Sequence, residues 1–213
     1  MGDVTIEAIQ EWTANLQLSD GSKRKVISVL SGILDRAVQT KHLGVNPALS
    51  VVRPRQKLKR RKYLNALQVE ALADAAGENR DLVLVLAYCG LRFGEMAALK
   101  VSSVDQLRRR FMIEASVTEV NGRIEWTEPK DHQRRSVPFP SFLDSEIAER
   151  MKDREPDALL FTAARGGVLR IGNARRDWFD PAARSAGLDG ITPHEMRHTA
   201  ASLAVKAGAS VLA

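Results

Sequence analysis

The chain has 213 residues, of which 44% are hydrophobic, and it carries 32 Lys and Arg against 26 Asp and Glu. This size allows one or two domains with a globular core. No leader peptide and no apolar run of about 18 residues is visible, and the single cysteine, Cys89, excludes an internal disulfide framework. We therefore expect a protein of a reducing cell interior that neither spans a membrane nor is secreted.

Two amphipathic helices are predicted near the amino terminus, over residues 4–17 and 22–40. Their apolar faces consist of Val4, Ile9, Trp12 and Leu16 on the first, and of Val26, Val29, Leu30, Ile33 and Leu34 on the second. Positive charge is concentrated here, because residues 1–64 hold twelve Lys and Arg against five Asp and Glu. A core of about sixty residues is marginal by itself.

A basic run follows these helices. Seven cations lie within ten residues, namely Arg53, Arg55, Lys57, Lys59, Arg60, Arg61 and Lys62. Pro54 disfavours a helix and the run contains no acid, so its simplest interpretation is a solvated linker. The alternative is a strap that lies along the backbone of DNA. Asn65 and Gln68 then form a capping box, which predicts that the next helix begins there.

A single charge, Arg92, directly follows an apolar stretch at residues 82–91. Arginine next to a hydrophobic helix is usually paired or directed at an anion, because unpaired burial is costly. Glu95, three residues further on, is spaced to hold Arg92 in place. Two interpretations stay open, a structural Arg92–Glu95 pair and an anion site.

Residues 109–139 predict a short antiparallel sheet. β-forming residues occupy 109–117, an Asn-Gly turn follows at 121–122, and residues 123–128 and 135–139 continue the pattern. This arrangement places Lys130 at the tip of a hairpin. A lysine at such a tip is normally solvated, so Lys130 alone indicates no function.

A TPHEMRH segment beginning at Thr192 predicts a helix start, with Pro193 at the first position and Glu195 completing a capping box. His194 and Arg197 are three residues apart, so they share a face of this helix near its first-turn N–H groups. This combination favours a phosphate group as ligand. A capped surface helix with incidental His and Arg is the alternative.

The same segment spells His194-Glu195-x-x-His198, the signature of zinc hydrolases. Such a site needs a third ligand and a glutamate that is free to act as general base. No His, Asp, Glu or Cys follows His198, and capping already engages Glu195. We therefore expect no metal site, and a zinc-dependent hydrolase is the least favoured interpretation.

The three motifs together, in this order and spacing, resemble the tyrosine recombinase (phage integrase) family. They are GLRFGEMAAL around Arg92, a Pro-Lys hairpin followed by RRSVP, and PHEMRHTAASL around His194. The resemblance covers almost the whole chain, because an Asn-Pro-Ala at residues 46–48 and the basic run resemble the end of that family's core-binding domain.

The resemblance implies catalytic roles for Arg92, Lys130, His194 and Arg197, with Glu95 as a supporting residue. In that family the two arginines hold the phosphate oxygens, the lysine protonates the leaving 5′ oxygen and the histidine assists proton transfer. A tyrosine attacks and becomes linked to the 3′ phosphate. Cations and an imidazole around one phosphate would neutralise the charge that develops in an in-line displacement, and no cofactor is expected.

The family's nucleophile follows the His194 motif, whereas both tyrosines of this chain, Tyr63 and Tyr88, precede it. We expect Tyr88 to pack in the core and Tyr63 at most to touch DNA. Ser210 resembles the N-cap of a further helix, and we expect the sequence to be truncated at both ends, before the nucleophile and within the first domain.

The expected fold is mainly α with a small antiparallel β-sheet (α+β). A partial helical core-binding domain at 1–52 and a basic linker at 53–63 precede a catalytic domain at 64–213 that lacks its C-terminal end. The resemblance implies site-specific DNA recombination and integration in the cytoplasm of a bacterial host cell, by a parent protein that is tetrameric on synapsed DNA.

The chain itself is expected to be monomeric, to bind double-stranded DNA at the core of an attachment site and to be inactive. A non-catalytic DNA-binding or regulatory module is the other open class, because such a module needs the basic run but not a convergence of the four catalytic side chains. Co-location of those side chains in one pocket discriminates the two.

Overall fold

The computed structural model describes residues 4–55, 62–128 and 135–209. The chain divides into two compact units, Met1–Arg60 and Arg61–Ala213, and the division falls within the predicted basic linker. Each unit is described by itself. In the described residues, no helix combines the length and the hydropathy needed to cross a membrane.

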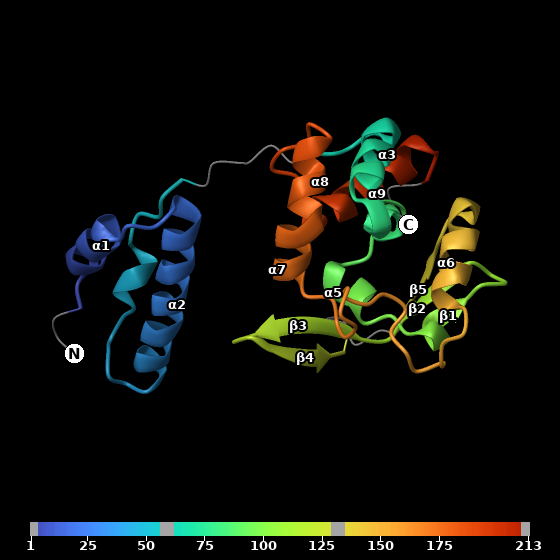
Figure 1. Ribbon diagram of the computed structural model, residues 1–213. Coiled ribbons are helices and arrows are strands. Elements are labelled where there is room, and N and C mark those ends of the chain that lie inside the picture. Colours follow the sequence, from blue (N-terminus) through green and yellow to red (C-terminus); the bar gives the residue numbers. More distant parts are fainter. Residues whose placement is uncertain (1–3, 56–61, 129–134, 210–213) are drawn as a thin grey trace. The chain divides into compact units, whose positions relative to one another are not determined.

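The first unit contains helices α1 (Ile6–Asn15) and α2 (Asp20–Gln39), as predicted, with slightly different ends (Figure 1). Each begins at a residue whose hydroxyl accepts a backbone N–H three residues on, Thr5 from Ala8 and Ser19 from Ser22. The small core consists of Ile9, Ile27, Leu34, Ala48 and Val51.

The predicted apolar faces of these helices differ from the buried ones. Trp12, Val29 and Ile33 are exposed, with Val29 at 65% and Ile33 at 61%. The reason is that α2 packs through Ile27, Ser31, Leu34 and Ala37, a side of the helix that shares only Leu34 with the predicted face. Helical periodicity identified the helix but not which of its apolar residues would find a partner within this unit.

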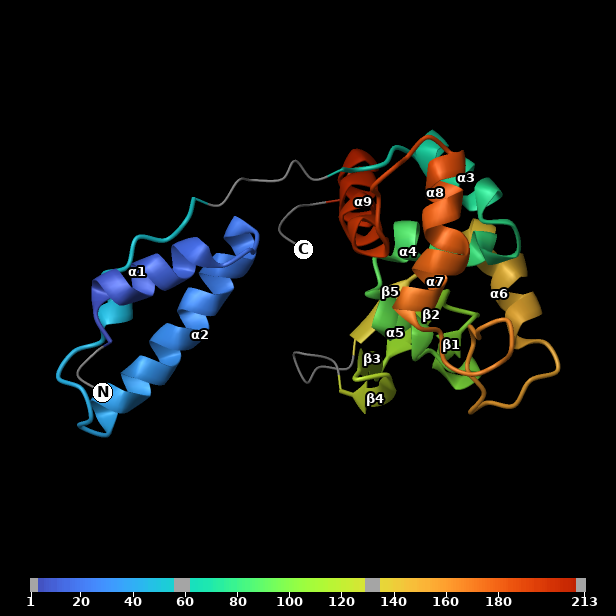
Figure 2. The same cartoon turned by 60° about the vertical axis from the view of Figure 1, so that its left-hand side comes forward.

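The second unit is built around a helical core. Its helices are α3 (Ala66–Ala75), α4 (Arg80–Cys89), α5 (Phe93–Ala97), α6 (Asp144–Met151), α7 (Ile171–Ala174), α8 (Asp180–Ser185) and α9 (Pro193–Lys206), and a π-helical turn (Arg175–Phe179) joins α7 to α8. Helix α4 lies between α3 and α9 and is buried along most of its length. In Figures 1 and 2, α3, α8 and α9 gather at one end of this unit and the strands at the other.

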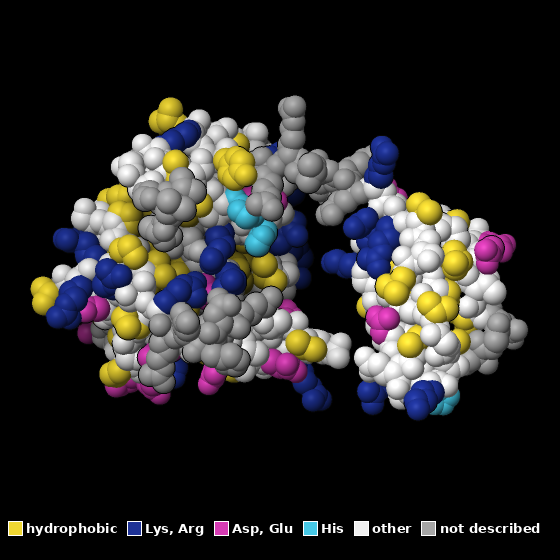
Figure 3. Space-filling model, turned by 180° about the vertical axis from the view of Figure 1, so that it is seen from behind, with side chains coloured by type: hydrophobic (Ala, Val, Ile, Leu, Met, Phe, Trp, Pro, Cys, Tyr) yellow, Lys and Arg dark blue, Asp and Glu magenta, His cyan; other side chains and the backbone are white. Residues whose placement is uncertain are grey.

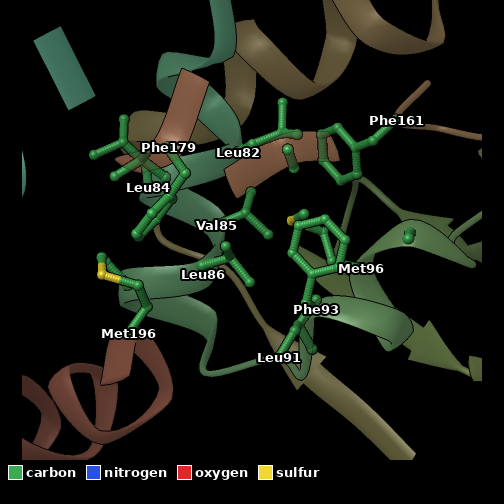
Figure 4. Close-up of a cluster of buried hydrophobic side chains, with 14 of the residues drawn as sticks. Leu82, Leu84, Val85, Leu86, Leu91, Phe93, Met96, Phe161, Phe179 and Met196 are labelled. Carbon is green, nitrogen blue, oxygen red and sulfur yellow. The ribbon is translucent and has the colours of Figure 1, made fainter. Parts of the chain in front are cut away.

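The core of this unit is almost entirely apolar. Figure 4 shows residues of α4 (Leu82, Leu84, Val85 and Leu86) packed near Phe93 and Met96 of α5 and Met196 of α9. Tyr88 packs against the edge of this core, with its ring 5.0 Å from that of Phe142. The expectation that Tyr88 is a packing residue is therefore confirmed.

The β-structure forms two small sheets, where the sequence predicted one. Strands β1 (Val104–Asp105), β2 (Arg110–Ile113) and β5 (Arg135–Pro138) form an antiparallel sheet in the order β1-β2-β5, and β3 (Ser116–Val120) pairs with β4 (Arg123–Thr127). The prediction of one continuous strand over residues 109–117 is wrong. Glu114 and Ala115 separate two strands, which belong to different sheets. The mainly α fold with small antiparallel sheets is confirmed.

Candidate active site

Two glycines place Arg92 where three elements meet. Gly90 ends α4 with φ +63°, and a Cβ there would lie 3.2 Å from the Cβ of Ala200 on α9. Gly94, in the first turn of α5, lies so close to β3 that a Cβ would meet the carbonyl oxygen of Val117 at 2.3 Å. The GLRFG sequence is therefore a tight corner whose two glycines approach α9 and β3, with Arg92 between them.

Glu95 is the centre of an arginine cluster. Its side chain is only 1% exposed, and Oε1 accepts a hydrogen bond from a terminal nitrogen of Arg92 at 2.8 Å. Its Oε2 accepts from the backbone N–H of Arg92 at 2.9 Å and from Arg135 at 2.7 Å. A terminal nitrogen of Arg197 lies 3.9 Å from the same oxygen. The expected Arg92–Glu95 pair is present, and it is part of a larger set.

This cluster carries excess positive charge. Three guanidinium groups surround one carboxylate, and each guanidinium side chain stays between 33% and 40% exposed. Burial lowers the pKa of Arg197, and the nearby charge of Arg92 lowers it further. Cations crowded together at a partly open surface lower their electrostatic energy by binding an anion. The cluster is therefore suited to a phosphate group.

Helix α9 supplies the other predicted side chains. Its cap forms as expected, because the backbone N–H of Thr192 donates to the Glu195 carboxylate at 3.0 Å and the Thr192 hydroxyl donates to the same oxygen. His194 is exposed on the first turn. Arg197, one turn further, donates to the carbonyl oxygen of Gly90 at 3.0 Å, which ties α9 to the corner that carries Arg92.

The amino-terminal end of the second unit lies against the same helix. The backbone N–H of Leu64 donates to the hydroxyl of Thr199 at 3.2 Å, and Lys62 donates to the carbonyl of Asp189. The ring of Tyr63 meets the ring of His198 edge-on at 6.4 Å, and His198 in turn meets His194 at 5.2 Å. Figure 3 shows Lys and Arg side chains beside His side chains on one face of this unit.

The structure thus brings Arg92, Arg197 and Glu95 together, and it places His194 on the same helix face as Arg197. Because both arginines lie next to Glu95, they are on the same side of the unit, as their proposed convergence requires. Lys130 lies outside the described residues, so its place relative to the cluster stays a prediction. The catalytic roles of all four stay predictions as well.

The basic run is described only in part. Arg53 donates to the hydroxyl of Ser28 at 3.2 Å, Arg55 is exposed, and Lys62 is bound to Asp189 as stated above. The remaining cations of the run, Lys57, Lys59, Arg60 and Arg61, lie outside the described residues.

The zinc interpretation finds no support in the described residues, among which no group of three or more His, Cys, Asp or Glu side chains is arranged to bind a metal ion. Glu195, which would have to serve as general base, is bound to the N-cap. Burial raises the pKa of the Cys89 thiol to about 12, which favours the protonated thiol at neutral pH.

Sequence reasoning missed two contributors to the site. Arg135 was assigned to a strand and to the RRSVP motif but to no site, although it bonds to Glu95. Tyr63 was expected at most to touch DNA, and its contact with His198 was not foreseen. Both contacts join residues at least 40 positions apart. The one local signal for Arg135 was an arginine in a sequence otherwise suited to a half-buried strand.

Comparison with known proteins agrees with this geometry. The profile described as the Phage integrase family matches residues 62–213. Tyrosine recombinase XerC from Bacillus licheniformis is 26% identical over 203 residues, which cover 88% of this chain and 62% of that protein. A putative prophage phiRv2 integrase from Mycobacterium tuberculosis is 24% identical, over 98% of this chain and 58% of the relative. The chain thus spans about three fifths of the length of these relatives.

Solved structures show the same fold. The Tn1549 transposon integrase in complex with a circular intermediate DNA superposes with a TM-score of 0.86 at 18% identity, over 98% of this chain and 75% of that one. A lambda integrase (75–356) dimer bound to a COC′ core site superposes with a TM-score of 0.70 at 21% identity, over 97% and 76%. Because the family profile matches most of the chain and the motif order agrees with it, the protein belongs to the tyrosine recombinase (phage integrase) family.

Proposed function

We propose that this chain is the DNA-binding and phosphate-holding part of a recombinase that cuts and rejoins DNA at specific sites. The observation that carries this proposal is the set of three arginines around the buried carboxylate of Glu95, with a net positive charge and an open side. The family membership and the superposition on integrases solved with DNA support it.

In the proposed reaction, Arg92 and Arg197 each hold non-bridging oxygens of one DNA phosphate. Arginine suits this task because its fork can donate to two oxygens at once. His194 donates a hydrogen bond to the phosphate and assists proton transfer. A tyrosine hydroxyl attacks the phosphorus and loses its proton, the bond to the 5′ oxygen breaks, and Lys130 protonates that oxygen. The 3′-phosphotyrosyl link preserves the bond energy, so attack by a new 5′ hydroxyl rejoins the strand.

The nucleophile is proposed to come from outside these 213 residues. Tyr88 packs against the core, and its pKa is raised because it is partly withdrawn from water. Tyr63 is 52% exposed and lies edge-on to His198, where it is proposed to contact DNA. This chain by itself is therefore proposed to bind DNA as a monomer without forming a covalent link, and the parent protein to act as a tetramer on synapsed DNA in the cytoplasm of a bacterial host.

The first unit offers a second basic surface for the DNA backbone. Arg24, Lys25, Ser28 and Arg53 border an open cavity of about 540 Å³. Arg24 is fixed by its hydrogen bond to the carbonyl of Pro54 at 3.0 Å, next to the start of the basic run. Cations presented in this way neutralise phosphates without reading sequence, so this surface is proposed to position the DNA.

A phosphate-interference experiment tests the proposal. A duplex that the chain prefers is first selected from a random pool, and each phosphate in turn is then replaced by a neutral methylphosphonate. One position should weaken binding strongly for the wild-type chain, and Arg197→Gln should lose sensitivity at that same position. Arg176→Gln, which removes an exposed arginine that bonds only to the adjacent Asp177 among the described residues, is the matched control.

The alternative, a DNA-binding module without a catalytic pocket, predicts a different result. In that case Arg197→Gln would leave the interference pattern unchanged, because no single phosphate would sit at the cluster. Incubation with nicked duplex supplies a second test, since the chain should form no adduct that survives denaturation. An adduct mapped to Tyr63 or Tyr88 would overturn the proposed position of the nucleophile.

A further inference from the structure

The carboxylate of Glu95 is buried but not fixed by packing on all sides. It borders a cavity of about 260 Å³, together with Leu99, Lys100, Met112 and Trp126. A side chain next to such a space can change its rotamer unless hydrogen bonds hold it. The orientation of Glu95 therefore depends on its hydrogen-bond donors.

The donors of Arg92 hold Glu95 only from within the first turn of α5. Its guanidinium and its backbone N–H both bond to Glu95, three residues away at the start of α5, so these bonds close a local ring. This ring includes a backbone N–H, so it holds the Glu95 carboxylate at the start of α5, but it makes no connection to the sheet. Arg135 joins the ring to a distant segment, because it reaches Glu95 from the first residue of β5 with a 2.7 Å hydrogen bond.

The backbone of Arg135 is itself well anchored. Its Cα pairs with that of Ile113 on the central strand β2, and Ile113 is 1% exposed. The charges that face Glu95 are those of Arg92, Arg135 and Arg197, and Lys100 and Glu114 border the adjoining cavity. Burial would raise the pKa of Glu95, but the hydrogen bond from Arg135 and the two from Arg92 more than offset this and lower it.

We infer that Arg135 is a positioning residue, which acts through Glu95 to direct the guanidinium of Arg92 at the phosphate. This inference rests on the proposed function of the site. It assigns no contact between Arg135 and the DNA, so its effect should be seen first on Glu95 and Arg92.

The test compares the 213-residue chain with Arg135→Gln, Arg135→Lys and the control Arg110→Gln. Arg110 is an apt control because it lies on β2 and donates to Ser136, next to Arg135, at 2.9 Å. NMR would follow the carboxyl titration of Glu95 and the order of the Arg92 Nε–H bond, and calorimetry would measure binding of inorganic phosphate. Arg135→Gln should raise the pKa of Glu95, lower the order of Arg92 and weaken phosphate binding about tenfold, the scale of one charge-assisted hydrogen bond.

Arg135→Lys should keep the pKa of Glu95 low, because it keeps the charge, but it should recover only part of the order of Arg92, because an ammonium group lacks the planar fork of a guanidinium. Arg110→Gln should show none of these losses. If Arg135→Gln does not fold, Arg135→Lys still decides, since an imperfectly placed cation should lower the order of Arg92. Unchanged Glu95 and Arg92 signals would overturn the inference. A wild-type chain that binds no phosphate, with the Glu95 and Arg92 signals shifted as expected, would instead count against the proposed function alone.

Discussion

Glu95→Gln removes the one carboxylate at the centre of the three arginines while keeping the shape of the side chain. Removing one partner from a fully buried ion pair costs about 3–5 kcal/mol, because the remaining charge is left without compensation. Here the arginine side chains stay between 33% and 40% exposed, so water relieves part of that cost. We expect a loss of about 2–3 kcal/mol, which corresponds to a Tm lower by about 4–12 °C for a unit of this size.

The assay is urea and thermal unfolding followed by tryptophan fluorescence in a Trp12→Phe background, so that Trp126 and Trp178 report the second unit. The matched control is Glu119→Gln, which breaks an ion pair with Arg170 at 2.5 Å whose side chains are each about one third exposed. Such a pair should contribute less than about 1 kcal/mol. Added phosphate should stabilise all three proteins, because each keeps the three arginines, and it should stabilise Glu95→Gln most, because that cluster has lost its carboxylate. Equal losses in the two variants would refute the view that Glu95 balances the cluster.

Three further outcomes are expected. Gly94→Ala should destabilise the second unit by about 2–4 kcal/mol in thermal unfolding, because its Cβ would meet the Val117 carbonyl at 2.3 Å, whereas Gly172→Ala, with open space around it, should cost nothing. The stability gap between wild type and Glu95→Gln should close in acid: the pKa of Glu95 lies below its ordinary 4.5, so its contribution is present above that value and is lost as the pH falls through the folded-state pKa. Changing Lys59, Arg60, Arg61 and Lys62 to Ala should flatten the log–log salt dependence of DNA binding by up to about 4 units with sequence preference retained, and an unchanged slope would show the run to be a solvated linker.

Local chemistry made parts of this site predictable. The capping boxes at Asn65 and Thr192 and the Arg92–Glu95 pair each depend on residues three positions apart, and all are present in the structure. The order of the three motifs indicated the family. Contacts at this spacing can be predicted from the sequence, because a helix brings residues i and i+3 together whatever the rest of the chain does.

Other parts depend on contacts that no local pattern encodes. Arg135 reaches Glu95 across 40 residues, and Tyr63 meets His198 beside the bond from Leu64 to Thr199 on α9. The break at Glu114 and Ala115 was missed because both flanking segments favour strands, and the choice of sheet is made by pairing partners. The exposure of Val29 and Ile33 likewise reflects which side of α2 finds a partner in its own unit.

The most direct test of the central claim is a crystal structure of this chain bound to its selected duplex. The account predicts one DNA phosphate at the cluster, with its non-bridging oxygens at about 2.7–2.9 Å from guanidinium nitrogens of Arg92 and Arg197, and His194 at the same phosphate. A complex in which the DNA backbone passes elsewhere, and Arg92 and Arg197 bond only to Glu95 and Gly90, would contradict it.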